Sequence, residues 1–298
     1  MNQFHVKCEI DYEALSPLVF LLNVRPQDNE SQTVLEENFS ILPHMPHTLL
    51  TCGVTQNRFD RITAELPGSY HILYEAVVGS TLEKIPVASL PPTTHEDFGL
   101  EQLPYLYPSR YCQSDRVGRL AESLFGGFET PVEKVQGIVE WVHQHIAYKR
   151  GSTTANTSAV DTLVDYAGVC RDFAHLGIAL CRALNIPARY FTGYAFKLEP
   201  PDFHACFETW IGGRWMLWDA TKLSSPDSVV RIGMGQDAAD VSVCTAFGSL
   251  KVKSQKVSCE YLGGARARMS DEELRRMVVC HEVRRAGAAS AEKPVIQP

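Results

Sequence analysis

The sequence predicts an α+β protein in which a cysteine-bearing helix packs on an antiparallel sheet, preceded by a small antiparallel β-domain. Two observations carry this prediction. Short β-rich runs separated by turn formers fill residues 1–88, and helical periodicity followed by strand-like runs fills residues 114–262. At 298 residues the chain is long enough for two domains. We expect a linker at 89–113 and a C-terminal helix with a mobile tail at 263–298.

Composition and charge exclude several classes of protein. A chain that is 45% hydrophobic and 21% charged is typical of globular proteins, and a net charge of -7 argues against nucleic acid as the main partner. The chain has no run of roughly 18 apolar residues, so we expect no membrane span. The first residues lack the pattern of a signal peptide. The nine cysteines are widely spread with no CxxC pair, unlike a disulfide framework or a zinc ribbon. These features predict a cytoplasmic protein.

The N-terminal strands are expected in runs of β-branched and aromatic residues bounded by turn signals. Pro67-Gly68 directly follows the run Arg58–Leu66 and favours a strand and a turn there over a helix. The Pro- and Thr-rich Ser89–Gly99 then marks the linker. The expected strands are Phe4–Ile10, Leu18–Val24, Thr48–Thr55, Arg58–Leu66 and Tyr70–Val78.

Helices are expected from Thr130 onward. Thr130, Pro131 and Glu133 form a capping-box sequence, and an apolar stripe at helical spacing follows as far as Ile146. A short helix is expected over Ala159–Tyr166, and a surface helix over Ser270–Val283, whose first turn is acidic.

Cys170 lies at the start of a further expected helix. Gly168 precedes it, apolar residues recur at helical steps after it, and Pro187 predicts an end near Asn185. A thiol in the first turn is close to unpaired backbone N–H groups and to the positive end of the helix dipole, and both favour the nucleophilic thiolate. The same amides, including that of Val169, could donate to a developing oxyanion.

A glycine hairpin supplies the partners that Cys170 needs. Gly212-Gly213 predicts a two-residue turn, which pairs Trp210 with Trp215 and continues to Cys206 opposite Asp219. His204 and Asp219 then share one face as diagonal neighbours, roughly 7 Å apart at the backbone. Asp219 could orient the imidazole of His204, and His204 could deprotonate Cys170 and later protonate a leaving amine.

Other candidate residues have plainer interpretations. We expect Asp172 to satisfy helix-terminal amides or an arginine, Asp237 and Asp240 to stabilise a turn, and His175, Cys181 and Cys206 to be structural. A zinc site of Cys170, Cys206, His204 and Asp219 is an alternative, although the short ligand spacing of zinc sites is absent. We therefore predict no metal and no cofactor.

The motif GVCRDFAHLGIALCRALNIPARYFTGY and the later FHACFETWIGGRWMLWDAT resemble the transglutaminase-like cysteine peptidase superfamily. The resemblance covers about Val132 to Thr221, and it is stronger for bacterial members with an N-terminal β-rich domain. It implies a papain-like core with Cys170 as nucleophile, His204 as base and Asp219 as orienting acid. Related enzymes use an aromatic or polar group from the region of Tyr148, so the resemblance also implies that Tyr148 could bind the oxyanion or line the cleft. Val169 at the helix start and Trp218 on the hairpin are further candidates for the oxyanion site or the cleft wall.

The resemblance implies a cysteine-dependent hydrolase of amide, peptide or isopeptide bonds that acts through an acyl-thioester on Cys170. An acyltransferase or transglutaminase using the same three residues is the alternative, and a non-catalytic binding module is the third. The crosslinking enzymes of animals add calcium sites and barrel domains, for which this chain has no evident room. The expected partner is a peptide or amide substrate, with no nucleic acid and no membrane. The sequence does not fix the oligomeric state.

Overall fold

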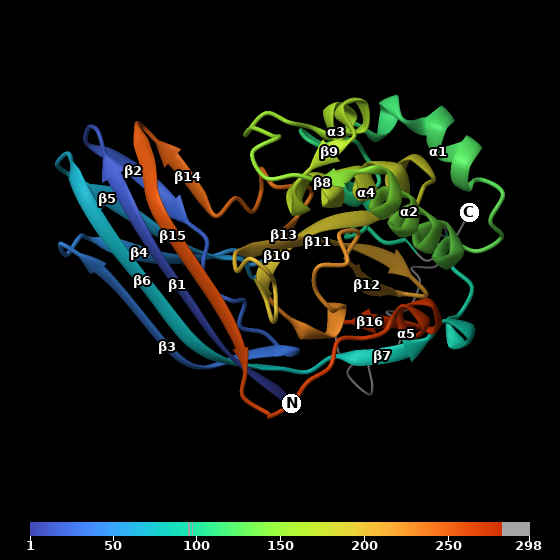
Figure 1. Ribbon diagram of the computed structural model, residues 1–298, viewed down its shortest axis with the longest axis horizontal. Coiled ribbons are helices and arrows are strands. Elements are labelled where there is room, and N and C mark those ends of the chain that lie inside the picture. The colour runs from blue at the N-terminus through green and yellow to red at the C-terminus, as the bar shows by residue number, and fades with distance from the viewer. Residues whose placement is uncertain (95, 97, 282–298) are drawn as a thin grey trace, which may run out of the picture.

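The computed structural model describes residues 1–94, 96 and 98–281. A β-rich part lies beside a mixed part in which helices cover a sheet (Figure 1), so the predicted α+β class is confirmed. The expected mobile tail falls in residues 282–298, outside the described residues. No described helix is both long and apolar enough to cross a membrane.

The β-rich part consists of two antiparallel sheets. Along β1 (Asn2–Ala14) buried and half-buried positions alternate, because successive side chains of a strand point to opposite faces and one face meets the core. The first sheet has the order β15-β1-β6-β3 and the second the order β14-β2-β5-β4. Their other bounds are β2 Leu18–Leu22, β3 Gln32–Leu42, β4 His47–Thr51, β5 Arg58–Ala64, β6 Gly68–Ser80, β14 Cys244–Phe247 and β15 Leu250–Tyr261.

Three of these strands differ from the sequence-based expectation. No strand is expected at β3, whose polar stretch QTVLEENFSIL lies largely exposed at the edge of its sheet. The late strands β14 and β15 pair with β2 and β1, and therefore complete the N-terminal sheets. This pairing differs from the expected division, which assigned all of 114–262 to the second domain. Pairing between strands so distant in sequence leaves no local signal.

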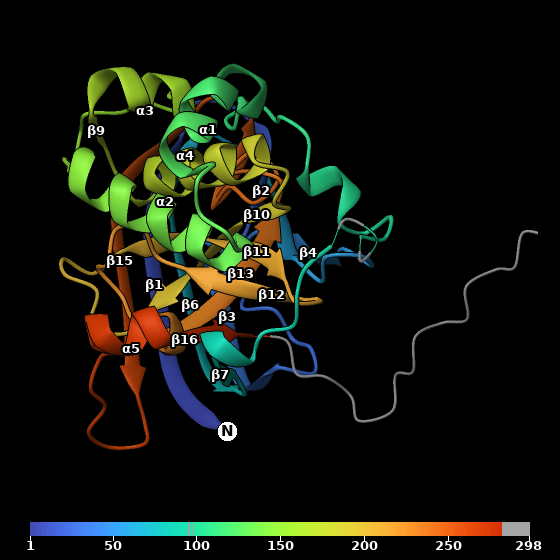
Figure 2. The same ribbon diagram turned by 90° about the vertical axis from the view of Figure 1, so that its right-hand side faces the viewer.

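The mixed part is a six-stranded sheet of order β13-β10-β11-β12-β16-β7. The helices α1, α2, α3 and α4 lie on one side of this sheet (Figure 2). The strands are β7 Glu83–Pro86, β10 Ala188–Ala195, β11 Phe203–Ile211, β12 Arg214–Trp218, β13 Val229–Gly235 and β16 Met277–Cys280; the helices are α1 Gly118–Phe125, α2 Pro131–His145, α3 Ala159–Asp165 and α4 Cys170–Ala183.

The central helix of this part is α4. Its residues from Asp172 to Arg182 are all buried, so it is enclosed on all sides, rather than amphipathic as the sequence suggested. The predicted capping box of α2 is confirmed: the Thr130 side chain accepts from Glu133, and Glu133 accepts from the Thr130 amide.

Two other expectations change. The surface helix expected at 270–283 ends early: α5 spans Asp271–Arg276, and β16 follows as a mostly buried strand of the large sheet. The apolar residues Met277–Cys280 bury more surface as a strand of the sheet than they would in an exposed helix, and this burial stabilises the strand. The expected linker contributes to the core, because Tyr111 and Cys112 are buried within it.

Candidate active site

Cys170 is the first residue of α4. Val169 before it has an extended backbone, and Asp172 closes the helix start by accepting the Val169 N–H at 2.8 Å. The side chain of Cys170 is half-buried, and its thiol is free. The helix start therefore presents Cys170 at the positive end of the dipole of α4, as predicted.

The β11–β12 hairpin has the predicted register. Gly212 and Gly213 adopt φ angles of +59° and +76°, which a two-residue turn of this kind requires and which glycine adopts without strain. Five consecutive pairs follow without a shift, from Ile211–Arg214 to Phe207–Trp218. The strand β12 ends directly before Asp219, so the turn chemistry brings His204 and Asp219 together.

His204 and Asp219 are joined by a hydrogen bond of 2.9 Å between Nε2 and Oδ2, and both side chains are 2% exposed. Burial opposes the imidazolium, but the Asp219 carboxylate outweighs it and the pKa of His204 lies well above its ordinary value. Burial likewise opposes the carboxylate, but His204 lowers the pKa of Asp219 to about 2. A buried imidazolium–carboxylate pair is the result.

Further donors hold the Asp219 carboxylate. Oδ1 accepts from the Thr221 amide at 2.9 Å and from its hydroxyl at 2.6 Å, and Oδ2 accepts from the Ser224 amide at 2.9 Å. Thr221 and Ser224 are positioning residues that are not among the sequence-based candidates. A carboxylate followed by hydroxyl residues two and five positions later was the available signal.

Cys170 is close enough to the imidazole of His204 to interact with it. Hydrogen bonding with the Cys170 thiol is among the influences that raise the pKa of His204. Within the described part of the chain, Nδ1 of His204 makes no hydrogen bond of normal geometry. Nε2 is held by Asp219, so Nδ1 is the nitrogen left to exchange a proton with the thiol.

Tyr148 is brought to the nucleophile by a short parallel pair of strands, β8 (Ala147–Tyr148) and β9 (Ala167–Gly168), in which Tyr148 pairs with Gly168. The pKa of Tyr148 is raised by burial and by Cys170, while a hydrogen bond to the Cys170 backbone acts in the opposite direction. The phenol hydroxyl therefore lies beside the helix start.

The two other candidates for oxyanion binding have their donors engaged. The Val169 N–H donates to Asp172. Trp218 is buried, and its indole N–H donates to the Thr209 hydroxyl at 2.8 Å. In this structure both residues support the fold around the site.

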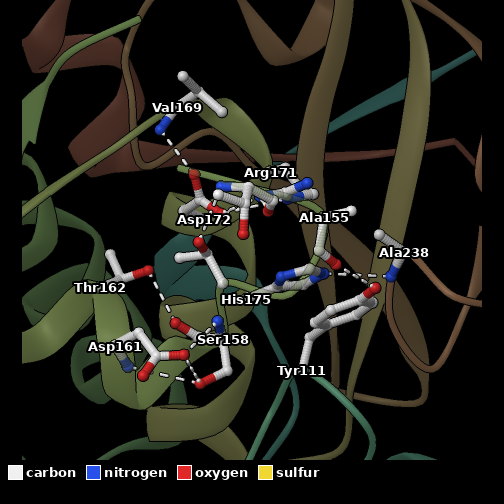
Figure 3. Close-up of polar contacts among 12 residues, drawn as sticks. Tyr111, Ala155, Ser158, Asp161, Thr162, Val169, Arg171, Asp172, His175 and Ala238 are labelled. Atoms are coloured by element: carbon white, nitrogen blue, oxygen red, sulfur yellow. Dashed lines mark hydrogen bonds and ion pairs between the residues drawn. The ribbon is translucent and has the colours of Figure 1, made fainter. Parts of the chain in front are cut away.

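A cleft opens over Cys170 and His204. Its walls include Tyr111, Ala155 and Tyr190 from the mixed part and Gln255 from β15. One wall is held by a stack: the rings of Tyr111 and His175 lie 5.0 Å apart and nearly parallel. Figure 3 shows this stack, with the Ala238 amide donating to His175 and the Tyr111 hydroxyl donating to the Ala155 carbonyl.

The remaining candidates have structural contacts. Asp172 accepts from Arg171 as well as from Val169 (Figure 3). Asp237 accepts from the amides of Ala239 and Tyr111, and Asp240 accepts from the Gln236 amide. The predicted roles of Asp172, Asp237 and Asp240 are therefore confirmed.

His204, Cys206 and Asp219 could offer metal ligands, since their donor atoms lie within 4.8 Å of one another. Burial raises the pKa of Cys206 to about 12, so this side chain is a neutral thiol near pH 7. Both oxygens of Asp219 are already hydrogen-bonded. The donor set fits the hydrogen-bonded arrangement better than a resident metal site.

Comparison with known proteins agrees with this architecture. Residues 118–220 match the transglutaminase-like superfamily, and residues 2–90 match the N-terminal domain of bacterial transglutaminases. A solved structure from Cytophaga hutchinsonii, described as a candidate cysteine protease, superposes with a TM-score of 0.91 at 40% identity, over 94% of this chain and 98% of the other. The chain belongs to the transglutaminase-like superfamily.

Curated relatives of this superfamily member include two uncharacterized proteins. The one from Mycobacterium leprae is 29% identical over 46% of this chain and 52% of its own length. The one from Mycobacterium bovis is 29% identical over 66% of this chain and 64% of its own length. The chain thus spans about half to two-thirds of these relatives. The comparisons support a cysteine-dependent enzyme of this superfamily.

Proposed function

We propose that the protein hydrolyses an amide, peptide or isopeptide bond through an acyl-thioester on Cys170. The observation that carries this proposal is the buried His204, which is hydrogen-bonded to Asp219 through Nε2 and also interacts with Cys170. Burying a charged pair costs desolvation free energy, and buried pairs with strongly shifted pKa values cluster at functional sites. The His204–Asp219 pair, which lies at a cleft, therefore supports a catalytic role.

In the proposed reaction, His204 takes the proton of the Cys170 thiol before the substrate binds, and the thiolate sulfur then attacks the carbonyl carbon. Asp219 stabilises the resulting imidazolium. The C–N bond then breaks as His204 protonates the leaving amine, and a water molecule, deprotonated by His204, releases the acid from the thioester. The Tyr148 hydroxyl is the donor proposed to stabilise the oxyanion.

The test is an intact-mass measurement after incubation with 4-nitrophenyl acetate. We expect one acetyl group, located by peptide mapping on Cys170 and lost with time. Cys170→Ala should fold and remain unmodified, whereas Cys206→Ala, which removes a neighbouring buried thiol, should still acetylate. Acetylation spread over several cysteines, or unchanged in Cys170→Ala, would refute the proposal.

The same thioester could be captured by an amine instead of water. Adding an amine during turnover separates hydrolysis from acyl transfer, because the amide product and the free acid differ in mass. We expect the acid to predominate. Predominant amide at millimolar amine would assign the protein as an acyltransferase.

A further inference from the structure

A groove beside the cleft runs along β15. It lies between this strand and the segment that connects β10 to β11. Its walls include the apolar side chains of Phe196, Leu198, Pro201 and Val257, and the charged residues Lys197 and Glu199 also line it.

The groove adjoins the cleft over Cys170. Asp202 lines both. Its Oδ1 accepts from Nε2 of Gln255 at 2.7 Å, so this contact between the β10–β11 connection and β15 marks the junction. Because Asp202 is followed directly by Phe203 and His204, the groove leaves the cleft on the His204 side.

The backbone of β15 forms one wall of the groove. Val257, Ser258 and Cys259 all line it, although consecutive side chains of a strand point to opposite faces. The edge of the strand must therefore face the groove. β15 is an edge strand whose sheet partner is β1. An edge of this kind offers backbone groups to an extended peptide.

We propose that this groove binds the amine side of a polypeptide substrate, as an extended segment along β15 with an apolar side chain against Phe196 and Leu198. The inference rests on the proposed function. His204 protonates the leaving amine, so the leaving portion lies on the side of His204, where the groove begins. The substrate is accordingly a peptide with an apolar residue beyond the scissile bond, and the N-terminal domain contributes to its recognition.

Capture of the acetyl-enzyme by peptide amines tests this site. The peptide nitrogen attacks the thioester carbonyl, the C–S bond breaks, and the amine proton passes to His204, which returns it to the Cys170 sulfur. The probes are glycine pentapeptide amides in which one leucine is moved from position 2 to position 5. Mass spectrometry gives the ratio of acetyl-peptide to acetate. We expect leucine at one position to raise this ratio at least about tenfold over the all-glycine peptide.

Two variants and a control locate the effect. Phe196→Ala should abolish the leucine preference, and so should Ser258→Trp, which fills the groove from a half-buried position without emptying the core. Phe247→Ala is the matched control, because Phe247 is 65% exposed on β14 and is not part of the groove. Equal ratios for all peptides, or a leucine preference that survives in both groove variants, would overturn the proposal.

A second measurement separates this proposal from the proposed function. The same peptides, labelled with fluorescein at the C-terminus, are titrated against Cys170→Ala, and binding is followed by anisotropy. Tighter binding of a leucine peptide that is lost in Cys170→Ala/Phe196→Ala supports the groove even if no acetyl-enzyme forms. Identical binding of leucine and all-glycine peptides contradicts it, whatever the chemistry at Cys170.

Discussion

Nε2 of His204 and Oδ2 of Asp219 are 2.9 Å apart, and both side chains are almost fully buried. His204 lies in β11 and Asp219 directly follows β12, and the Gly212-Gly213 turn sets the register of these two strands. The relationship fixes which imidazole nitrogen is free to face Cys170.

Replacing the carboxylate should impair the imidazole without unfolding the protein. Asp219→Asn keeps the size of the side chain but removes the charge that stabilises the imidazolium. We expect kcat/KM to fall by about 10²- to 10⁴-fold. Asp165→Asn, at the exposed end of α3, is the matched control and should be unchanged. Full activity in Asp219→Asn would show that Asp219 does not act through His204.

The Asp219 pair should also stabilise the fold in a pH-dependent way. The pKa of Asp219 is about 2 in the folded protein, below its usual value, so the native state binds fewer protons than the unfolded state between these values. This contribution is present above about pH 4 and is lost as pH falls toward 2. Urea unfolding of wild type and Asp219→Asn at several pH values measures it. Their difference in unfolding free energy should shrink by about 2 kcal/mol over this range, and a constant difference would contradict the assignment.

The Tyr148 hydroxyl should contribute to the chemical step. Tyr148→Phe removes only this group, and we expect kcat to fall by about 10² while KM changes little, because the hydroxyl acts on the developing oxyanion. Tyr166→Phe, at an exposed tyrosine near by in sequence, serves as control. A change confined to KM would instead place Tyr148 in substrate binding.

Buried histidines should make the fold acid-sensitive. Burial lowers the pKa of His175 to about 3 and that of His281 to about 4. Unfolding lets both bind protons below about pH 6.5, so the free energy of unfolding should decrease as pH falls from 6.5 toward 4. In His175→Gln, whose amide oxygen can still accept the Ala238 N–H, this decrease should be smaller by about 3 kcal/mol. His143→Gln, at an exposed position, should behave like wild type; an equal slope in all three proteins would contradict the account.

Local chemistry explains how much of the site the sequence predicts. A two-glycine turn determines the pairing of its own strands, so the proximity of His204 and Asp219 could be derived from Gly212-Gly213 alone. The start of α4 at Cys170 could likewise be predicted from the sequence, because the apolar residues at helical spacing begin there.

Features that depend on long-range pairing could not be predicted. Nothing local to β15 indicates that it pairs with β1, and so the presence of Gln255 at the cleft was not foreseen. The stack of Tyr111 on His175 joins an expected linker to α4, and neither segment signals the other. The residues of β16 are expected in a helix, because their strand partners β7 and β12 are distant in sequence and leave no local signal.

The most direct test of the central claim is the rate at which iodoacetamide alkylates each cysteine near pH 7, followed by peptide mapping. Cys52 is exposed and provides an internal reference within the same chain. The account predicts that half-buried Cys170 reacts faster than Cys52, that its alkylation abolishes activity, and that His204→Gln removes the rate advantage. Alkylation of Cys170 no faster than that of Cys52, with activity retained after it is modified, would contradict the account.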